Sequence, residues 1–418
     1  MSATAQPHLL RNINFRWLLG GGLVSMLGDQ FSMLALPWLV LSLTGDSFSL
    51  GIAVALMGAP RAVLILLGGT VADRYSPRRV LLASKLANAA ILLALAGLLM
   101  LEQASLALAY GAALALGIAA AFAIPAGTAI LPQAVPPQTL QTANSLQMGA
   151  RQLSLLAGPL LAALVLGTHD SARQTGMTAL AAAFAIDALT FLFSAWTLRQ
   201  VTLRPLAVAA AQGMWRDMAA GLAMVWRDIP LRSCYVYWAV VAFFVMGPLQ
   251  VALPVLASER LHGASALGLL MGAHGAGTLA GMLASSLGGA WLRRRFGATL
   301  LLVDAVVGLL LMALGQIGTA WQGAALLAVT GILGGYLQVA IFTWIQRRVA
   351  PAMLGRAMAL FMGIFLGLAP LSAAVTGALL RHLSVGELFC GGGTLLLAAA
   401  MAAALFTAIP RIAGPETI

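Results

Sequence analysis

The chain has 418 residues, 61% of them hydrophobic and only 8% charged, with a net charge of +11. Soluble globular proteins carry roughly a quarter of charged residues, so this composition excludes a water-soluble fold and requires hydrocarbon around much of the surface. The positive charge does not indicate nucleic-acid binding, because the basic residues lie between apolar runs and form no single patch.

Apolar runs of about twenty residues predict membrane-spanning helices along the whole chain. Six are expected in the first half, at 17–43, 49–71, 80–101, 105–130, 142–167 and 177–198. Six more are expected at 233–257, 264–290, 298–318, 323–345, 357–380 and 388–409. The segment before the first run lacks the features of a removable signal peptide, so the first span is expected to direct insertion. We predict an all-α membrane protein with two six-helix bundles, at 1–198 and 233–418.

Segment 199–232 is the longest segment between spans, and we predict that it holds an amphipathic helix on the cytoplasmic face. An apolar stripe at helical spacing is formed by Trp215, Met218, Leu222, Val225 and Trp226. Such a stripe is typical of a helix at a membrane surface. We expect it to link the two bundles, since nothing in the sequence supports a regulatory role.

Basic residues predict that both ends of the chain are cytoplasmic. Eighteen of the twenty-three lysines and arginines fall on the side of the termini, and only Arg173, Arg260 and Arg381 fall on the other side. This bias follows the positive-inside rule, so we expect a multi-pass protein of the bacterial inner membrane. The remaining two, Arg61 and Arg151, lie inside predicted spans.

Cysteine and histidine give no sign of a disulfide, a metal or a cofactor. Cys234 and Cys390 begin spans at opposite faces of the membrane, which is incompatible with a disulfide. The five histidines are scattered without metal-ligand spacing, so a membrane-embedded enzyme is not favoured. No phosphate-binding Gly-rich Lys-Ser/Thr motif occurs either, which argues against direct use of ATP.

The two halves of the chain carry the same landmarks in the same order. Ala35–Pro37 recurs as Ala252–Pro254, and Leu50-Gly51 recurs as Leu267-Gly268, both at an offset of 217 residues. The other repeated landmarks are Gly68-Gly69 with Gly288-Gly289, Val135-Pro136-Pro137 with Val349-Ala350-Pro351, and Gly158-Pro159-Leu160 with Ala369-Pro370-Leu371. Such repeats are typical of transporters made of two similar bundles, which rock and expose a central site to each side in turn.

The loop between the second and third spans, GTVADRYSPRR, resembles the signature loop of the major facilitator superfamily. That pattern is Gly, three residues, Asp-Arg, any residue, Gly and then basic residues. The matching residues are Gly69, Asp73, Arg74, Arg78 and Arg79. Ser76 stands where the family has Gly, and Pro77 replaces one basic residue, so the turn is expected to be built differently.

The resemblance implies a gating role for this loop. Asp73 is expected to lie against the cytoplasmic start of the eleventh span, near Gly355 and Arg356, and to hold the outward-open state closed inside. A carboxylate is favoured at a helix N-terminus, and breaking this contact would cost on the order of 1 kcal/mol. The alternative is that these charges only set the topology, which explains the arginines but not the aspartate.

Further motifs resemble the twelve-span drug and siderophore exporters of the same superfamily, the macrolide efflux and enterobactin export type. They are Gly28-Asp29, Ala35-Leu36-Pro37-Trp38, Thr44-Gly45, Pro125-Ala126, Ala143-Asn144-Ser145 and Gly158-Pro159. Gly158-Pro159 resembles an antiporter motif, although the family's preceding glycine is Ser154 here. The fourth span lacks the arginine of another antiporter motif, so proton coupling is expected to use other residues.

Charged residues inside the spans are candidate coupling residues, because a charge at the bilayer centre costs roughly 3 kcal/mol. Asp29 lies midway along the first span, which the resemblance implies lines the cavity. We predict that Asp29 binds and releases the coupling proton, with Arg61 and Arg151 as available partners. A purely structural ion pair is the alternative.

Three further charged residues and one histidine lie within spans. The resemblance places Asp187 and Asp304 on peripheral helices, and Lys85 occupies the place in the first half that Asp304 occupies in the second. We expect these three to have a structural role more than a role in transport. His274 is expected to make a hydrogen bond between helices.

The sequence therefore predicts a secondary transporter. The favoured form is a proton-coupled exporter of small amphipathic or apolar compounds, monomeric and without a cofactor. The alternative is an importer or a lipid flippase on the same fold.

Overall fold

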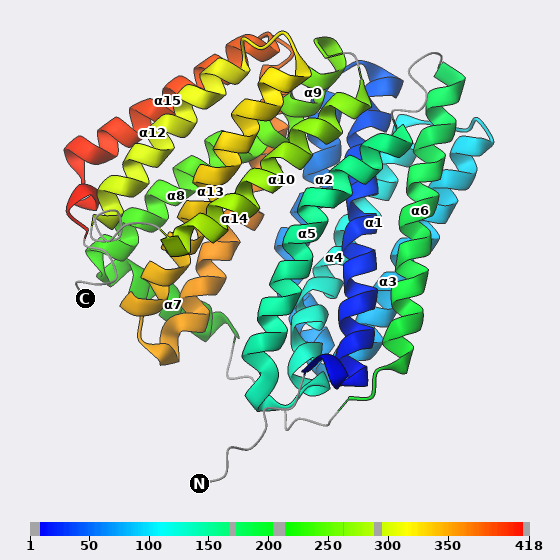
Figure 1. The fold of residues 1–418 in the computed structure, drawn as a ribbon, viewed down its shortest axis with the longest axis horizontal. Coiled ribbons are helices and arrows are strands. Elements are labelled where there is room, and N and C mark those ends of the chain that lie inside the picture. The colour runs from blue at the N-terminus through cyan, green and yellow to red at the C-terminus, as the bar shows by residue number, and fades with distance from the viewer. Residues whose placement is uncertain (1–8, 167–172, 204–213, 262, 288–294, 413–418) are drawn as a thin grey trace. The chain divides into compact units, whose positions relative to one another are not determined.

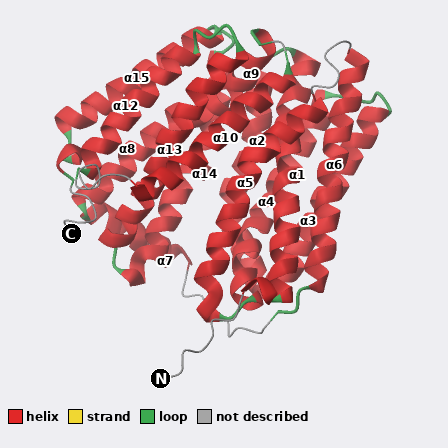
Figure 2. Cartoon of the chain, in the orientation of Figure 1, coloured by secondary structure: helices red, strands yellow, loops and turns green. Residues whose placement is uncertain are grey.

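The computed structural model of the protein describes residues 9–166, 173–203, 214–261, 263–287 and 295–412. Within these ranges the chain forms helices joined by short loops, without a strand (Figures 1 and 2). In the same ranges, 12 helical segments are long and apolar enough to cross a membrane. This confirms the predicted all-α membrane fold with twelve spans.

The chain forms two compact units. The first contains residues 1–44 and 59–209, and the second contains residues 45–58 and 210–418. The predicted bundle boundaries place 45–58 in the first half, whereas its contacts join it to the second unit. The reason is close packing, because a Cβ at Gly51 would lie 3.0 Å from the Gly377 Cα and one at Gly58 would lie 2.6 Å from the Pro370 ring.

The first unit is built from the first six spans. Its helices are α1 (Ile13–Thr44), α2 (Ser47–Tyr75, whose first residues pack with the second unit), α3 (Pro77–Met100), α4 (Leu106–Ala134), α5 (Leu140–Leu166) and α6 (Arg173–Gln200), with short 3-10 turns at Leu9–Arg11 and Pro137–Thr139. Helix α1 packs against α5 and α6, and α3 packs against α4 and α6. Small residues allow these approaches, since a Cβ at Gly21 would overlap Thr197 of α6 and one at Gly68 would overlap the Ala121 carbonyl of α4.

The second unit holds the other six spans and one additional helix. Its helices are α7 (Met214–Arg227), α8 (Ile229–Gly247), η3 (Pro248–Ala252), α9 (Leu253–Glu259), α10 (Ala264–Leu287), α12 (Phe296–Leu314), α13 (Ala320–Arg348), α14 (Pro351–Leu379), α15 (Val385–Phe406) and a short turn at Ile409–Arg411. Helices α8, η3 and α9 form one span, with a π-helical turn at η3. The basic loop predicted around Gly288-Gly289 lies outside the described residues.

Close helix pairs and an aromatic cluster form the core of the second unit. Helix α10 packs along α13, where a Cβ at Gly277 or Gly281 would overlap a backbone carbonyl of α13. Phe296 stacks on Trp344 at 5.1 Å between ring centroids, and Trp344 is fully buried. The free cysteines are Cys234, which is buried, and Cys390, which is partly exposed.

Helix α7 is the amphipathic helix predicted in the linker. The structure places it against α14, with Val225 buried and Gly221 against the Arg356 side chain. Leu222 and Trp226 remain exposed. The side chains of Trp215 and Met218 lie outside the described residues, and the rest of the stripe is half packed and half exposed, as in an amphipathic helix. The predicted place of α7 on the cytoplasmic face stays a prediction.

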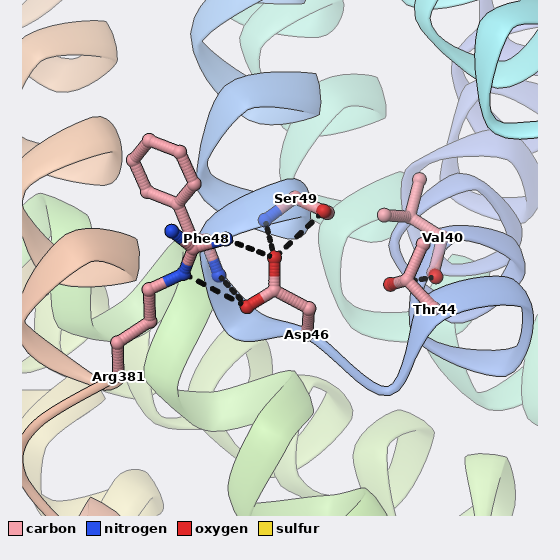
Figure 3. Close-up of polar contacts among 6 residues, drawn as sticks. All are labelled: Val40, Thr44, Asp46, Phe48, Ser49 and Arg381. Atoms are coloured by element: carbon pink, nitrogen blue, oxygen red, sulfur yellow. Dashed lines mark hydrogen bonds and ion pairs between the residues drawn. The ribbon is translucent and has the colours of Figure 1, made fainter.

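An ion pair between Asp46 and Arg381 joins the start of α2 to the end of α14 (Figure 3). Arg381 Nε and Nη2 donate to the two Asp46 oxygens at 3.2 and 3.0 Å. Asp46 also accepts from the backbone N–H groups of Phe48 and Ser49, which caps α2. The Arg381 guanidinium lies 4.2 Å from the Phe48 ring centroid, and the hydrogen bonds from Arg381 hold the pKa of the Asp46 carboxyl well below its usual range.

Candidate functional site

A cluster of three ionisable side chains lies within the first unit, where α1, α3 and α6 meet. It consists of Asp29 on α1, Lys85 on α3 and Asp187 on α6. Lys85 interacts electrostatically with both aspartates, and the two aspartates interact with each other. Asp187 is buried, and Asp29 and Lys85 are partly buried, so two acids and one base share a region with little access to water.

Asp187 is held directly against α1. Its side chain is 1% exposed, and Ser32 of α1 donates a hydrogen bond to Oδ2. The hydroxyl oxygen of Thr190, one turn along α6, lies 3.3 Å from Asp187 Oδ1. The approach depends on Gly28, because a Cβ there would lie 2.7 Å from Asp187 Oδ1 and would overlap the Thr190 hydroxyl.

Lys85 reaches the same region from α3. Its Nζ donates to the buried Ser25 hydroxyl of α1 at 3.2 Å, and it lies 5.5 Å from the ring centroid of Phe191 on α6. The ring face attracts the ammonium group without neutralising it. Lys85 is thus positioned between α1 and α6, where its charge offsets that of one carboxylate.

The coupling role that the sequence predicts for Asp29 stays a prediction, and the electrostatic neighbours of Asp29 in the structure are Lys85 and Asp187. Arg61 and Arg151 were expected beside Asp29, whereas the electrostatic neighbour of Arg61 in the structure is Arg151. Arg61 lies on α2 and its buried Nε has no hydrogen-bond partner among the described residues. Arg151 lies on α5 and is exposed. The coupling role predicted for these two arginines stays a prediction.

A stripe on α1 carries the signal that could have revealed the cluster. Gly21, Ser25, Gly28 and Ser32 follow one another at intervals of three or four residues, which places them on one helix face. Each is small, and two carry hydroxyls that contact Lys85 and Asp187. A small and polar face on an otherwise apolar span indicates a neighbouring helix that brings buried polar groups.

Asp304 and His274 lie within the second unit. Asp304 on α12 is 5% exposed and lies beside the side chain of Tyr237 on α8. The Nδ1 atom of His274, on α10, lies 3.4 Å from the Leu327 carbonyl oxygen of α13. This is the contact between helices that the sequence predicts for His274.

The signature loop connects α2 to α3. Gly69 and Arg74 belong to the last turns of α2, while Asp73 lies there with a side chain outside the description. Ser76, which replaces the family's Gly, has a φ of 82°, a conformation that favours glycine. Pro77 begins α3 at a position where proline is well tolerated.

The basic residues of the loop have distinct environments. Arg78 Nη2 donates to the Arg199 carbonyl at 2.6 Å and so ties the start of α3 to the end of α6. Arg79 is exposed. Gly355 and Arg356 lie near the start of α14 in the second unit. The predicted gating contact of Asp73 stays a prediction.

Gly158 and Pro159 of the antiporter-like motif lie in the interior of α5. A Cβ at Gly158 would overlap the side chain of Gln30, which is the residue after Asp29 on α1. The motif therefore permits α5 to approach α1 next to the charged cluster.

A family model described as Major Facilitator Superfamily matches residues 18–374. Among curated proteins, the chain is 26% identical to the enterobactin exporter EntS of Citrobacter koseri over 77% of its own length and 74% of the relative's. It is 26% identical to the multidrug efflux pump Tap of Mycobacterium tuberculosis over 85% and 84% of the two lengths. It is 27% identical to the uncharacterised transporter y4rN of Sinorhizobium fredii, and that match spans 65% of both chains.

Solved structures show the same fold at low sequence identity. A mutant form of the nucleoside transporter NupG matches with a TM-score of 0.71 and 16% identity, over 94% of this chain and 99% of that one. A D-xylose-proton symporter matches with a TM-score of 0.69 and 14% identity, over 96% and 98%. The family model, the twelve spans and these folds agree, and the chain is a member of the major facilitator superfamily.

Proposed function

We propose that the protein is a proton-coupled exporter of small amphipathic compounds that works by alternating access in the bacterial inner membrane, with both termini in the cytoplasm. The observation that carries the proposal is the cluster of Asp29, Lys85 and Asp187. Membership of the superfamily supports a transport function. The cluster supports proton coupling, because it contains acidic groups that can hold and release a proton.

The charges of the cluster favour binding of one proton. With all three groups ionised the cluster carries one net negative charge, and a net charge is costly in a region of low dielectric constant. Uptake of one proton by either aspartate leaves a neutral set with one ammonium and one carboxylate. Because the two acids interact, the proton belongs to the pair as a whole. When the cluster is open to water on one side of the membrane it would take up the proton, and when it is open to the other side it would release the proton.

The direction of transport rests on the relatives. The enterobactin exporters and the multidrug efflux pump align over most of their lengths, whereas the solved structures share only the fold. We therefore propose export. Import, or flipping of a lipid, is the alternative direction of transport that the experiment below can reveal.

Arg61 and Arg151 favour substrates that carry a negative charge. Two arginines that interact inside spans repel each other, and such a pair is stabilised when an anion lies between or beside them. Buried Arg61 Nε also lacks a hydrogen-bond partner among the described residues. An amphipathic compound with one acidic group would satisfy both features.

Transport in oriented membrane vesicles tests the proposal. A panel of anionic, cationic and neutral amphipathic compounds, with enterobactin among them, would first be screened for growth protection of a sensitised bacterium. The compound found is expected to accumulate in inside-out vesicles when the interior is acidified, and Asp29→Asn should abolish that accumulation. Asp304→Asn, which removes a buried carboxyl from the second unit, serves as the matched control.

Two results would contradict the proposal. Accumulation of the compound only in right-side-out vesicles would show uptake. If the Asp29→Asn and Asp187→Asn variants still export the compound in response to the pH gradient, the cluster is not the coupling site.

A further inference from the structure

An apolar groove with a basic end lies on the first unit, formed by α2, α3 and α4. Its volume is about 660 Å³. It is lined from α3 by Arg79, Ala83, Ala87 and Ile91, which are spaced four residues apart and so share one helix face. None of these residues belongs to the Asp29, Lys85 and Asp187 cluster, so the groove is a separate feature.

Small side chains create the groove. The α3 face carries Ala83 and Ala87, and the facing part of α4 carries Ala115 and Ala119. Helices that pack along each other through alanine leave a furrow wherever the backbones do not close fully. Larger residues, Ile118 and Phe122 of α4 and Ile91 of α3, form its sides.

The groove has the length of one acyl chain in one leaflet. Arg79 and Ile91 are twelve residues apart, a distance of about 18 Å along an α-helix. One leaflet contributes about 15 Å of hydrocarbon to a typical bilayer. A lipid tail that starts at Arg79 would therefore end near Ile91, close to the middle of the membrane.

The polar end has the groups that recognise a lipid phosphate. Arg79 and Tyr75 both line the groove there and are exposed. Tyrosine is enriched at the level of lipid headgroups, and basic pockets between spans bind anionic headgroups. Arg74 and Arg78 add positive charge at the same helix ends. The charge is complementary to an anionic headgroup, and the alanines are complementary to a tail.

We propose that this groove binds one anionic phospholipid of the surrounding leaflet, with its phosphate on Arg79 and one acyl chain between α3 and α4. The site stabilises the α2, α3 and α4 side of the first unit. The proposal does not depend on the direction or coupling of transport.

Native mass spectrometry of the full-length protein in detergent tests the site. The protein would be titrated with phosphatidylglycerol and with phosphatidylethanolamine of identical acyl chains. We expect one tightly retained phosphatidylglycerol and weaker retention of phosphatidylethanolamine. Arg79→Gln should weaken phosphatidylglycerol binding about fivefold, the factor for the roughly 1 kcal/mol that one basic residue contributes near an anionic surface. The control Arg16→Gln removes an exposed charge of α1, which does not line the groove, and should leave binding unchanged.

The acyl part is tested by filling the furrow. Ala87→Trp should lower retention of phosphatidylglycerol, while Ala90→Trp, on an exposed α3 position outside the groove, should not. If Ala87→Trp does not yield a monodisperse protein, Ala87→Leu makes a smaller change of the same kind. Circular dichroism checks the helix content of each variant.

Three results would overturn the proposal. Equal retention of the two lipids would remove the headgroup preference. Equal effects of the groove variants and their controls would show that the groove is not the site. Displacement of the lipid by an exported compound, with loss of that compound's binding in Ala87→Trp, would make the groove a substrate entry route.

Discussion

Asp187 and Lys85 show how a buried charge is stabilised inside a span. Asp187 accepts from Ser32 and lies within reach of the Thr190 hydroxyl, and Lys85 donates to Ser25. Hydrogen bonds and an opposite charge together offset the cost of removing ions from water. Removal of Lys85 leaves the two acids of the cluster without its cation, whereas removal of Asp187 leaves Lys85 with Asp29.

A double-mutant cycle tests this coupling. We expect Lys85→Met to destabilise the protein by about 3 kcal/mol, because it removes the cation of the cluster and leaves its two acids, and Asp187→Asn to cost less, because Lys85 keeps its interaction with Asp29. The double variant should cost clearly less than the sum of the single costs. Thermal unfolding in detergent measures the three values. Additive effects would contradict an interaction between the two residues.

Ser76 is a residue in a conformation suited to glycine. With φ at 82°, replacement by glycine should stabilise the protein by about 1 kcal/mol, since the strain of the Cβ is removed. Ser76→Ala keeps the Cβ and should give no gain. The two variants are compared by their unfolding temperatures, and equal behaviour would show that the turn carries no strain.

At the scale of elements, the approach of α1 to α6 beside the charged cluster depends on Gly28. A Cβ at Gly28 would overlap the Thr190 hydroxyl, so Gly28→Ala should destabilise the protein by about 1 to 3 kcal/mol. Gly20→Ala on the same helix has no atom within 4 Å of the new Cβ and should be neutral. The second change Thr190→Ala should recover part of the loss. A neutral Gly28→Ala would contradict the helix contact.

The pair of Asp46 and Arg381 anchors α2 to α14 and predicts a dependence on pH. The lowered pKa of Asp46 means that the folded state favours the carboxylate. The stabilisation is therefore complete above about pH 4, the ordinary pKa of aspartate, and is lost as pH falls below it. Since the pair is partly exposed, we expect Arg381→Gln to cost about 0.5 to 1 kcal/mol at pH 7.

Two aspartate variants separate the ion pair from the helix cap. Asp46→Asn keeps an oxygen that can accept from the Ser49 N–H and should lose only the ion pair, whereas Asp46→Ala should lose both. Unfolding of the four proteins from about pH 7 down to about pH 2, through the ordinary pKa of aspartate, measures the difference. A cost of Arg381→Gln that stays the same below about pH 4 would contradict the ionic contribution.

At the scale of the whole molecule, hydropathy alone predicted the number and order of the spans. It underestimated their length, as in α1, which begins at Ile13 and not at 17, because helices continue into the interface where polar residues are tolerated. The stripe in segment 199–232 also predicted α7. These features follow from composition along the chain, which a sequence displays directly.

The partners of the charged residues could not be predicted in the same way. Asp29, Lys85 and Asp187 come from three spans, and Asp46 and Arg381 are separated by 335 positions. No fixed spacing marks such pairs, and the approach that joins them depends on which helices pack. The small face of α1, from Gly21 to Ser32, was the available signal, because it shows where another helix comes close.

The central claim is that the cluster of Asp29, Lys85 and Asp187 holds a proton, and that the protein releases this proton when the substrate binds. Addition of the screened compound to purified protein in weakly buffered solution, followed with a pH indicator, measures this release. The account predicts release of about one proton per protein for the wild type and for Asp304→Asn, and none for Asp29→Asn. Substrate binding by the wild type without proton release, or release that persists in Asp29→Asn and Asp187→Asn, would contradict it.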